Sequence, residues 1–273
     1  MKQLEKSEYR MISECITHGF VRTVSGSLGN CELLHVPRQA FDLDLARYQH
    51  AAYVTTLREA GIAVTVLPEE PTLPDATFVE DTIVVLDEIA VMCRLGPPSR
   101  QAEVMRMEQE IINIHSIRRI VAPGTLEGGD VLRIGKSLYV GLSSRTNADG
   151  IRQLQEIVSP FSYAVSVVNV GGCLHLKTGA TSPAEGILVA NPGWIDLTPF
   201  RHLEIISVPD TEPWGANTLS VNGTVLVAES SPRTADLLES RDLKVQRLEI
   251  SELQKAEAGL TCLSILFQAA GKV

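Results

Sequence analysis

The chain has 273 residues, of which 44% are hydrophobic and 21% charged, and its formal net charge is −9. This composition is typical of a soluble globular protein. An acidic chain without a Lys/Arg cluster argues against nucleic acid as a partner, and the charge is compatible with a small cationic substrate. No apolar run reaches the length that spans a membrane, and the charged start, Met1–Lys6, lacks the apolar core of a signal peptide.

The five cysteines lie far apart, at positions 15, 31, 93, 173 and 262, without a C-x-x-C pair. This spacing fits neither a disulfide framework nor a zinc ribbon, so we expect a reducing, cytoplasmic compartment. The six histidines show no H-x-H or H-E-x-x-H spacing, so we expect no zinc site.

The predicted elements alternate along the chain. Residues 1–24 give no clear pattern, and residues 25–38 predict a long loop in which Leu28 stands exposed as a lid residue, or else anchors the loop in the core. Apolar spacing predicts helices over 42–60, 101–115, 146–158 and 234–240. We expect strands over 62–67, 119–122, 164–170, 187–190, 244–248 and 263–268, and hairpins over 78–95, 131–142 and 217–228. Asn222-Gly223 gives the strongest hairpin signal.

A repeat underlies this order. Pro-Ser-Arg at 98–100, Ser-Ser-Arg at 143–145 and Ser-Pro-Arg at 231–233 each follow a hairpin and open a helix, and their arginines are 45 and then 88 residues apart. Such a period indicates five or six copies of one supersecondary unit, arranged as a closed ring of small sheets with helices outside. The alternative is an ordinary α/β sandwich. No linker is apparent, so we expect a single domain over residues 1–273.

Polar side chains gather in four turn or loop segments. Asp75, Glu80 and Asp81 fall within seven residues at the start of a predicted strand. Clustered carboxylates are stable together where a guanidinium or a divalent metal lies between them; otherwise they form a solvated acidic loop. Glu127 precedes Gly128-Gly129, and glycines permit a tight turn and a close backbone approach.

The other two segments contain His175, which alternates with two leucines, and Cys262, which lies between a glycine-containing turn and an apolar run. Each alone is more often structural, the cysteine as a small buried hydrophobe. Together with a carboxylate they form a candidate set of nucleophile, base and orienting group.

Six segments, taken in order, carry a resemblance over most of the chain. They are P-D-A-T-F-V-E-D from Pro74, C-R-L-G with Arg94, E-G-G-D-V-L from Glu127, S-R-T-N with Arg145, L-H-L-K-T with His175, and T-C-L-S with Cys262. The chain resembles the dimethylarginine dimethylaminohydrolases of the guanidine-modifying pentein superfamily. The resemblance implies a five-bladed α/β propeller of ββαβ units that needs no metal and no cofactor, and whose substrate is a small guanidine amino acid.

The resemblance also implies roles for single residues. Cys262 would attack the guanidinium carbon, His175 would act as acid and base, and Glu127 would orient it. The guanidinium would be held by Asp81, Glu80 and Asp75, the α-carboxylate by Arg94 and Arg145, and the site closed by Leu28. The products would be citrulline and dimethylamine.

Alternatives stay open at this point. Arginine deiminases usually carry an aspartate two residues after the histidine, and this chain has Lys177, which favours methylated arginines. An arginine deiminase or another guanidine hydrolase remains the second candidate, and a binding protein without chemistry the third. Whether the chain forms a homodimer is also open.

Overall fold

The computed structural model describes residues 15–111 and 116–268, and there the strands form five three-stranded sheets. In each sheet the middle strand pairs antiparallel with one neighbour and parallel with the other. The strands of the sheets, in spatial order, are β15 (Ile265–Phe267), β1 (His18–Arg22) and β2 (Ala63–Leu67); β3 (Ile83–Val85), β4 (Ala90–Met92) and β5 (Ile117–Arg119); β6 (Val131–Ile134), β7 (Ser137–Leu142) and β8 (Ala164–Asn169); β9 (Ala180–Thr181), β10 (Ile187–Ala190) and β11 (Glu204–Ser207); β12 (Leu219–Val221), β13 (Thr224–Ala228) and β14 (Val245–Leu248).

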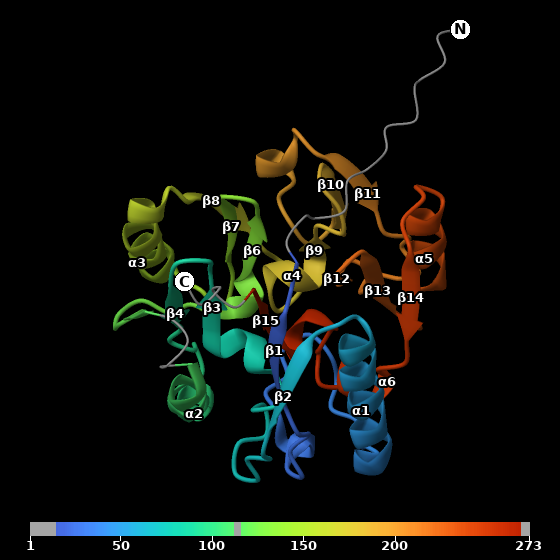
Figure 1. Ribbon diagram of the computed structural model, residues 1–273, viewed down its shortest axis with the longest axis horizontal. Helices are drawn as coiled ribbons and strands as arrows, with labels where there is room; N and C mark the ends of the chain where they lie inside the picture. Colours follow the sequence, from blue (N-terminus) through green and yellow to red (C-terminus); the bar gives the residue numbers. More distant parts are fainter. Residues whose placement is uncertain (1–14, 112–115, 269–273) are drawn as a thin grey trace, which may run out of the picture.

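A crossover joins the middle strand of each sheet to its parallel partner. Four crossovers contain a helix, namely α1 (Leu43–Glu59), α2 (Gln101–Ile111), α3 (Ala148–Val158) and α5 (Pro232–Glu239). The fourth sheet along the chain has only the 3-10 turn η6 (Thr198–Phe200) in this place. Figure 1 shows the sheets placed around the middle of the molecule, with these four helices towards the outside. Because β15 pairs with β1, the two ends of the chain meet in one sheet.

Local sequence signals explain where several elements begin and end. Asp42 caps α1 by accepting a hydrogen bond from Leu45 N at 3.0 Å, and Gly61 follows the helix with a φ of 87°. Asn147 caps α3 in the same way. Asn222 and Gly223 have φ values of 41° and 90°, as a tight turn between antiparallel strands requires. The predicted hairpin at Asn222 is therefore confirmed.

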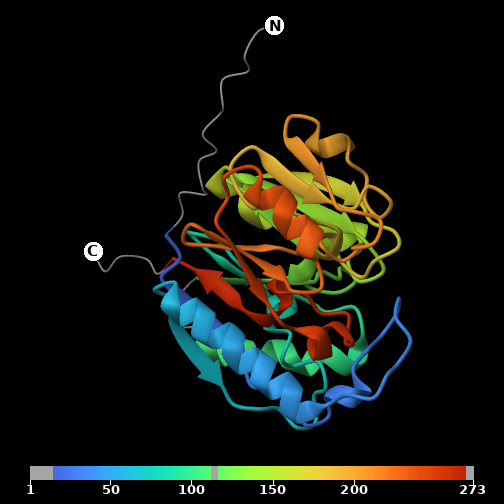
Figure 2. The same ribbon diagram turned by 90° about the vertical axis from the view of Figure 1, so that its right-hand side faces the viewer.

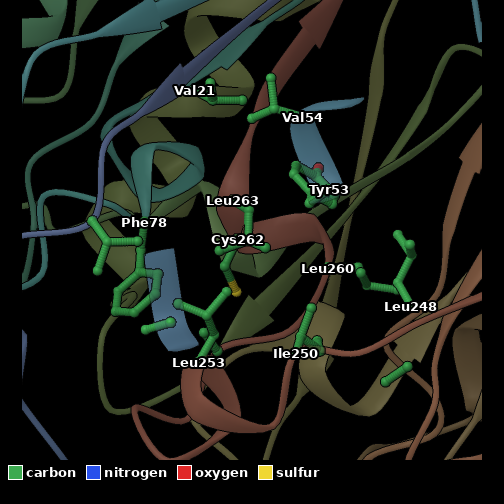
Figure 3. Packing of buried hydrophobic residues seen from close by; sticks show 14 of the residues in the cluster. Val21, Tyr53, Val54, Phe78, Leu248, Ile250, Leu253, Leu260, Cys262 and Leu263 are labelled. Carbon is green, nitrogen blue, oxygen red and sulfur yellow. The ribbon is translucent and has the colours of Figure 1, made fainter. Parts of the chain in front are cut away.

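The apolar core consists of clusters between the sheets and the helices. The one that matters for the site packs the buried face of α1 against the segment before β15. Figure 3 shows this cluster around Cys262, with Leu253, Leu260 and Phe78 among its neighbours. Tyr53 of α1 is fully buried there, and its hydroxyl lies 2.7 Å from Ser264 Oγ. The core therefore fixes the chain on both sides of Cys262. Figure 2 shows α1 running across the outside of β2.

Two segments predicted as strands begin with a 3-10 turn instead. The segment expected as a strand from Phe78 begins with a 3-10 turn, η2 (Val79–Thr82), before β3. The last strand was expected from Leu263, but Thr261–Leu263 form another 3-10 turn, η7. The helix predicted to end at His115 is observed as α2, and residues 112–115 lie outside the described residues, as do residues 1–14.

Leu28 also differs from its prediction as an exposed lid residue. It begins a short 3-10 turn, η1 (Leu28–Asn30), and its side chain is fully buried in the cluster against α1. A large apolar side chain in a loop is more stable packed than exposed, so Leu28 anchors the loop, which was the alternative interpretation. It does not line the cavity described below.

In the part of the chain that the structure describes, the helices are too short or too polar for any of them to cross a bilayer.

Candidate active site

A narrow cavity brings together five of the nine residues predicted for the site. Cys262, His175, Asp81, Asp75 and Arg145 all line it. Its remaining walls are both apolar and charged, formed by Glu32, Phe78, Arg100, Leu174, Ala256, Glu257 and Ala258. These residues come from segments distant in sequence, so the cavity exists only in the folded chain.

Cys262 sits on η7, in the segment between α6 (Ser251–Gln254) and β15. Its side chain is 7% exposed, and Gly259 N points at its sulfur from 3.4 Å. Burial, together with the negative charges of Glu80 and Asp81, raises the pKa of the Cys262 thiol to about 12. The thiol is therefore neutral at rest, and a positive charge beside it would favour the nucleophilic thiolate.

His175 and Glu127 form a buried pair. His175 precedes the single helical turn α4 (Leu176–Gly179), and its Nε2 lies 2.6 Å from Glu127 Oε2. Glu127 is itself held by Gly96 N, which donates to Oε1 at 3.0 Å. Burial alone would lower the pKa of His175, but Asp81 and Glu127 raise it to about 9. The imidazole is therefore protonated at neutral pH and can act as an acid.

Asp81 is the carboxylate nearest this pair. Its Oδ1 lies 3.8 Å from His175 Nε2 and accepts a hydrogen bond from Gly129 N at 3.1 Å. Its Oδ2 accepts from Arg100 Nη1 at 2.9 Å. Burial alone would raise the pKa of Asp81, but the charges of His175 and Arg100 lower it to about 2. Asp81 therefore stays ionised and can hold a cation in the cavity.

The two glycines after Glu127 allow these groups to approach one another. A Cβ on Gly129 would lie 2.7 Å from His175 Nδ1 and 2.8 Å from Asp81 Oδ1. A Cβ on Gly128 would lie 2.0 Å from the carbonyl oxygen of Glu80. The expected close approach is confirmed, whereas the φ values of Gly128 and Gly129 lie outside the left-handed region.

Glu80 is not brought to this cavity. Its carboxylate accepts hydrogen bonds from Lys177 Nζ at 2.6 Å and from Thr261 Oγ1 at 2.8 Å. All three residues line a second, wider cavity. Their neighbours Asp81, His175 and Cys262 line the narrow one, so the two sets face in different directions. The geometry gives no support to Glu80 as a ligand of the guanidinium, and the charge of Lys177 is paired with that of Glu80.

Arg94 and Arg145 were predicted as a pair, but only Arg145 lines the cavity. Arg94 is half-buried, and its Nη1 donates to the carbonyl oxygen of Gly124 at 3.3 Å. Arg145 is 7% exposed, and its Nη1 has no hydrogen-bond partner, although Glu127 Oε1 lies 3.7 Å away. A buried guanidinium nitrogen without an acceptor suits a bound anion.

The second arginine of the cavity is Arg100, which the sequence interpretation missed. It is 3% exposed and bonds Asp81 and both carboxylate oxygens of Glu103 at 2.9–3.1 Å. The signal was present in the repeat, because Arg100 and Arg145 occupy the same place in successive Ser-Arg repeats. Their positions before equivalent helices bring both to the cavity, whereas Arg233 of the third copy does not line it.

Asp81, Glu127 and His175 also form a set that could hold a metal ion, with ligand atoms within 4.8 Å of one another. Arg100 already places a fixed positive charge 2.9 Å from Asp81 and 3.8 Å from Glu127. This guanidinium already neutralises part of the negative charge of the set.

A thiol, a protonated imidazole and an ionised carboxylate around one cavity are the combination expected of an enzyme with a cysteine nucleophile. A family model described as "N,N dimethylarginine dimethylhydrolase, eukaryotic" matches residues 38–177. The N(G),N(G)-dimethylarginine dimethylaminohydrolase of Streptomyces coelicolor is 36% identical over 247 residues, which cover 90% of this chain and 95% of that protein. The enzyme of the same name from Pseudomonas aeruginosa is 33% identical over 228 residues, 83% of this chain and 90% of that protein.

The fold agrees with this similarity. A solved structure of the Pseudomonas aeruginosa enzyme in complex with citrulline superimposes with a TM-score of 0.89 at 32% identity, and the match covers 93% of this chain and 100% of that one. The chain belongs to the dimethylarginine dimethylaminohydrolase family.

Proposed function

We propose that this protein hydrolyses Nω-methylated arginines, such as asymmetric dimethylarginine and monomethylarginine, to citrulline and the corresponding methylamine. The observation that carries the proposal is the shared cavity of Cys262, His175 and Asp81 in a chain of this family. Asp81 is ionised and can bind the positive guanidinium beside the thiol. The apolar side chains of Phe78 and Leu174 line the same cavity and can pack against methyl and methylene groups.

The resting electrostatics explain why the substrate takes part in activating the nucleophile. Burial and the neighbouring carboxylates keep the pKa of Cys262 at about 12, so the free enzyme holds almost no thiolate at neutral pH. A guanidinium bound against Asp81 places a positive charge next to the sulfur, which lowers the thiol pKa. The thiol then loses its proton to the solvent, so the reactive thiolate forms only when a cationic substrate is present.

The covalent step follows from these positions. The Cys262 thiolate attacks the guanidinium carbon, and a C–S bond forms. His175, protonated because its pKa is about 9, donates its proton to the departing amine as the C–N bond breaks. The product of this step is an amine and a thiouronium carbon attached to Cys262.

The second step returns the enzyme to its starting state. His175, now neutral, accepts a proton from a water molecule, whose oxygen attacks the thiouronium carbon. The C–S bond breaks, the ureido group of citrulline forms, and the sulfur leaves as a thiolate that is protonated again. Glu127, 2.6 Å from His175 Nε2, fixes the ring and stabilises its charged form throughout.

The substrate contacts are assigned by charge. Asp81 and Asp75 take the guanidinium, and the unpartnered Nη1 of Arg145 takes the α-carboxylate. Arg100 replaces Arg94 as the second arginine of the site, and it holds Asp81 in place.

We also propose that the fold is a five-bladed α/β propeller and that residues 1–273 form one domain. Five sheets with the same strand order support a five-unit repeat. The wider cavity supports it as well, because residues of β3, β6, β9, β12 and β15, one outer strand from each sheet, line it together. The pairing of β15 with β1 closes the ring and supports a single domain. A cytoplasmic location, a homodimer and the absence of nucleic-acid or membrane partners stay predictions from the sequence.

The test is a substrate panel. Purified protein is incubated with arginine, monomethylarginine, asymmetric and symmetric dimethylarginine, and agmatine, and both the ureido product and the released amine are quantified. We expect the highest kcat/KM with asymmetrically methylated arginines. Arginine turned over equally well or better would assign the protein to the deiminase reaction instead, and no ureido product from any compound would contradict the proposal.

A further inference from the structure

Asp130 is a buried carboxylate to which the reaction described above gives no role. It ends the 3-10 turn η4 (Gly128–Asp130) directly before β6, and its side chain is fully buried. Its Oδ1 accepts a hydrogen bond from Leu176 N at 2.9 Å, and its Oδ2 accepts one from Ser143 Oγ at 2.6 Å. Burying a charge costs free energy unless the charge is hydrogen-bonded, so these contacts hold Asp130 in place.

The hydrogen bonds around Ser143 fix the direction of its contact with Asp130. Ser143 Oγ accepts the backbone N–H groups of Arg145 and Thr146, at 3.0 and 3.1 Å. These two donors occupy both lone pairs of the hydroxyl oxygen, so its own O–H donates to Asp130. Because Leu176 N donates to the other oxygen, Asp130 accepts at both oxygens, as an ionised carboxylate does.

The first partner of Asp130, Leu176, lies directly after His175 at the start of α4. The first N–H groups of a helix usually find an acceptor in the side chain of the residue that precedes it. The His175 side chain makes no such bond, and its ring is bonded to Glu127 instead. Asp130 supplies the acceptor, and it thereby fixes the backbone from which the His175 ring projects.

The second partner, Ser143, belongs to the turn that carries Arg145. Ser143 Oγ holds the Arg145 backbone N–H, and Asp130 in turn holds the Ser143 hydroxyl. Asp130 therefore joins two segments from different parts of the chain. One carries the acid–base histidine, and the other carries the arginine assigned to the α-carboxylate of the substrate.

The neighbouring strand leaves space for Asp130 through a glycine. A Cβ on Gly141 of β7 would lie 2.4 Å from Asp130 Oδ1 and 3.0 Å from Leu176 Cβ. Glycine at this position permits the close approach that the contact between Asp130 and Leu176 requires.

We propose that Asp130 is a positioning residue that fixes His175 and Arg145 relative to each other. This inference rests on the proposed function and adds a residue that acts on the reaction without touching the substrate. A substrate held at its carboxylate end reacts only if its other end meets the acid–base group in the correct place. A displacement of about 1 Å in such a site can cost about a hundredfold in rate.

The test measures kcat and KM for asymmetric dimethylarginine in two variants. Asp130→Ala removes both contacts, and we expect kcat to fall on the order of a hundredfold because the His175 ring is displaced. Ser143→Ala releases the Arg145 turn but keeps the bond between Asp130 and Leu176. We expect this variant to raise KM about tenfold, while kcat stays within about threefold of the unaltered value.

Glu212→Ala is the matched control for a purely structural role. Glu212 is also a buried carboxylate, and it accepts the backbone N–H groups of Arg233 and Thr234 at 2.9 and 2.8 Å, but it does not line the narrow cavity. Urea unfolding should show a loss of stability in this variant as in Asp130→Ala, whereas its kcat and KM should stay within about threefold of the unaltered values.

The outcomes that would overturn the proposal differ from those that concern the reaction itself. A folded Asp130→Ala variant with normal kcat, or an equal loss of kcat in Glu212→Ala, would leave Asp130 with only a structural role. Ser143→Ala removes a single hydroxyl and decides the matter if Asp130→Ala does not fold, because an unchanged KM would overturn the proposal. An unaltered protein that does not hydrolyse dimethylarginine would instead contradict the proposed function.

Discussion

Arg100 offers the sharpest test of how the charged groups of the site are held together. Its guanidinium is 3% exposed and bonds Asp81 and Glu103, whose side chains are each 3% exposed. Replacing Arg100 with Met keeps much of the side-chain volume but leaves these carboxylates without their cation. Removing one partner of a buried ion pair costs about 3–5 kcal/mol, because the remaining charge stays out of water.

The pKa of Glu103 decides at which pH the loss of stability should be larger. Burial raises the pKa of Glu103 to about 7 even with Arg100 beside it. Without Arg100 that pKa rises further, so Glu103 takes up a proton near neutral pH. The free-energy cost of burying its unpaired charge therefore disappears as the pH falls. The destabilisation should therefore be larger at pH 8.5 than at pH 6.

The assay is urea unfolding of both proteins at the two pH values. Arg152→Met is the matched control, since Arg152 is 56% exposed and pairs with Glu156 at 2.7 Å on the surface of α3. An exposed pair of this kind contributes little to stability, because water and salt screen its charges. If Arg100→Met lost no more stability than Arg152→Met, or lost less at high pH, the electrostatic account of the site would be refuted.

The remaining predictions concern the substrate, the packing and the proton balance of the site. Arg145→Ala should raise KM for dimethylarginine about tenfold to a hundredfold and change it much less for N-methylated agmatine, which has no carboxylate; equal effects on both would mean that Arg145 has only a structural role. Gly129→Ala should lower kcat on the order of a hundredfold by displacing His175, while Gly171→Ala, whose Cβ meets open space, should not; similar rates in the two variants would contradict this packing. The pKa of His175 is raised from 6.5 to about 9 on folding, so its stabilising contribution is complete below about pH 6.5 and is lost as the pH rises through 9. Unfolding measured at pH 6 and pH 9.5 should show this loss in the unaltered protein and a smaller one in His175→Asn, and identical pH profiles would disprove it.

Local signals in the sequence were sufficient for much of the fold. The helix α1, the hairpins of β6–β7 and β12–β13, and the strand β10 follow from apolar spacing, caps and turn residues. Parts of the fold that depend on distant contacts were not predicted. The strand β11 and the two-residue strand β9 have little pattern of their own, and the 3-10 turns η2 and η7 interrupt apolar runs that read as continuous strands.

The residues of the site also divide into those that the sequence predicted and those that depend on the folded backbone. Residue type and order predicted Cys262, His175, Glu127 and Asp81, and the structure places the first two and Asp81 at one cavity with Glu127 bonded to the histidine. Which way each neighbour faces depends on backbone geometry, so the orientation of Glu80 towards Lys177 could not be read from the sequence. The exposure predicted for Leu28 was wrong because the loop packs against α1, a contact between segments that the local sequence does not show.

The central claim is that Cys262 forms a covalent bond to the guanidinium carbon and that His175 promotes its hydrolysis. The direct measurement is the intact mass of the protein after rapid acid quench during turnover of asymmetric dimethylarginine, followed by peptide mapping. We predict a thiouronium adduct on Cys262 that is transient in the unaltered protein, accumulates in His175→Asn, where water lacks its base, and is missing in Cys262→Ser. An active Cys262→Ser variant, or turnover with the adduct on another residue, would contradict the account.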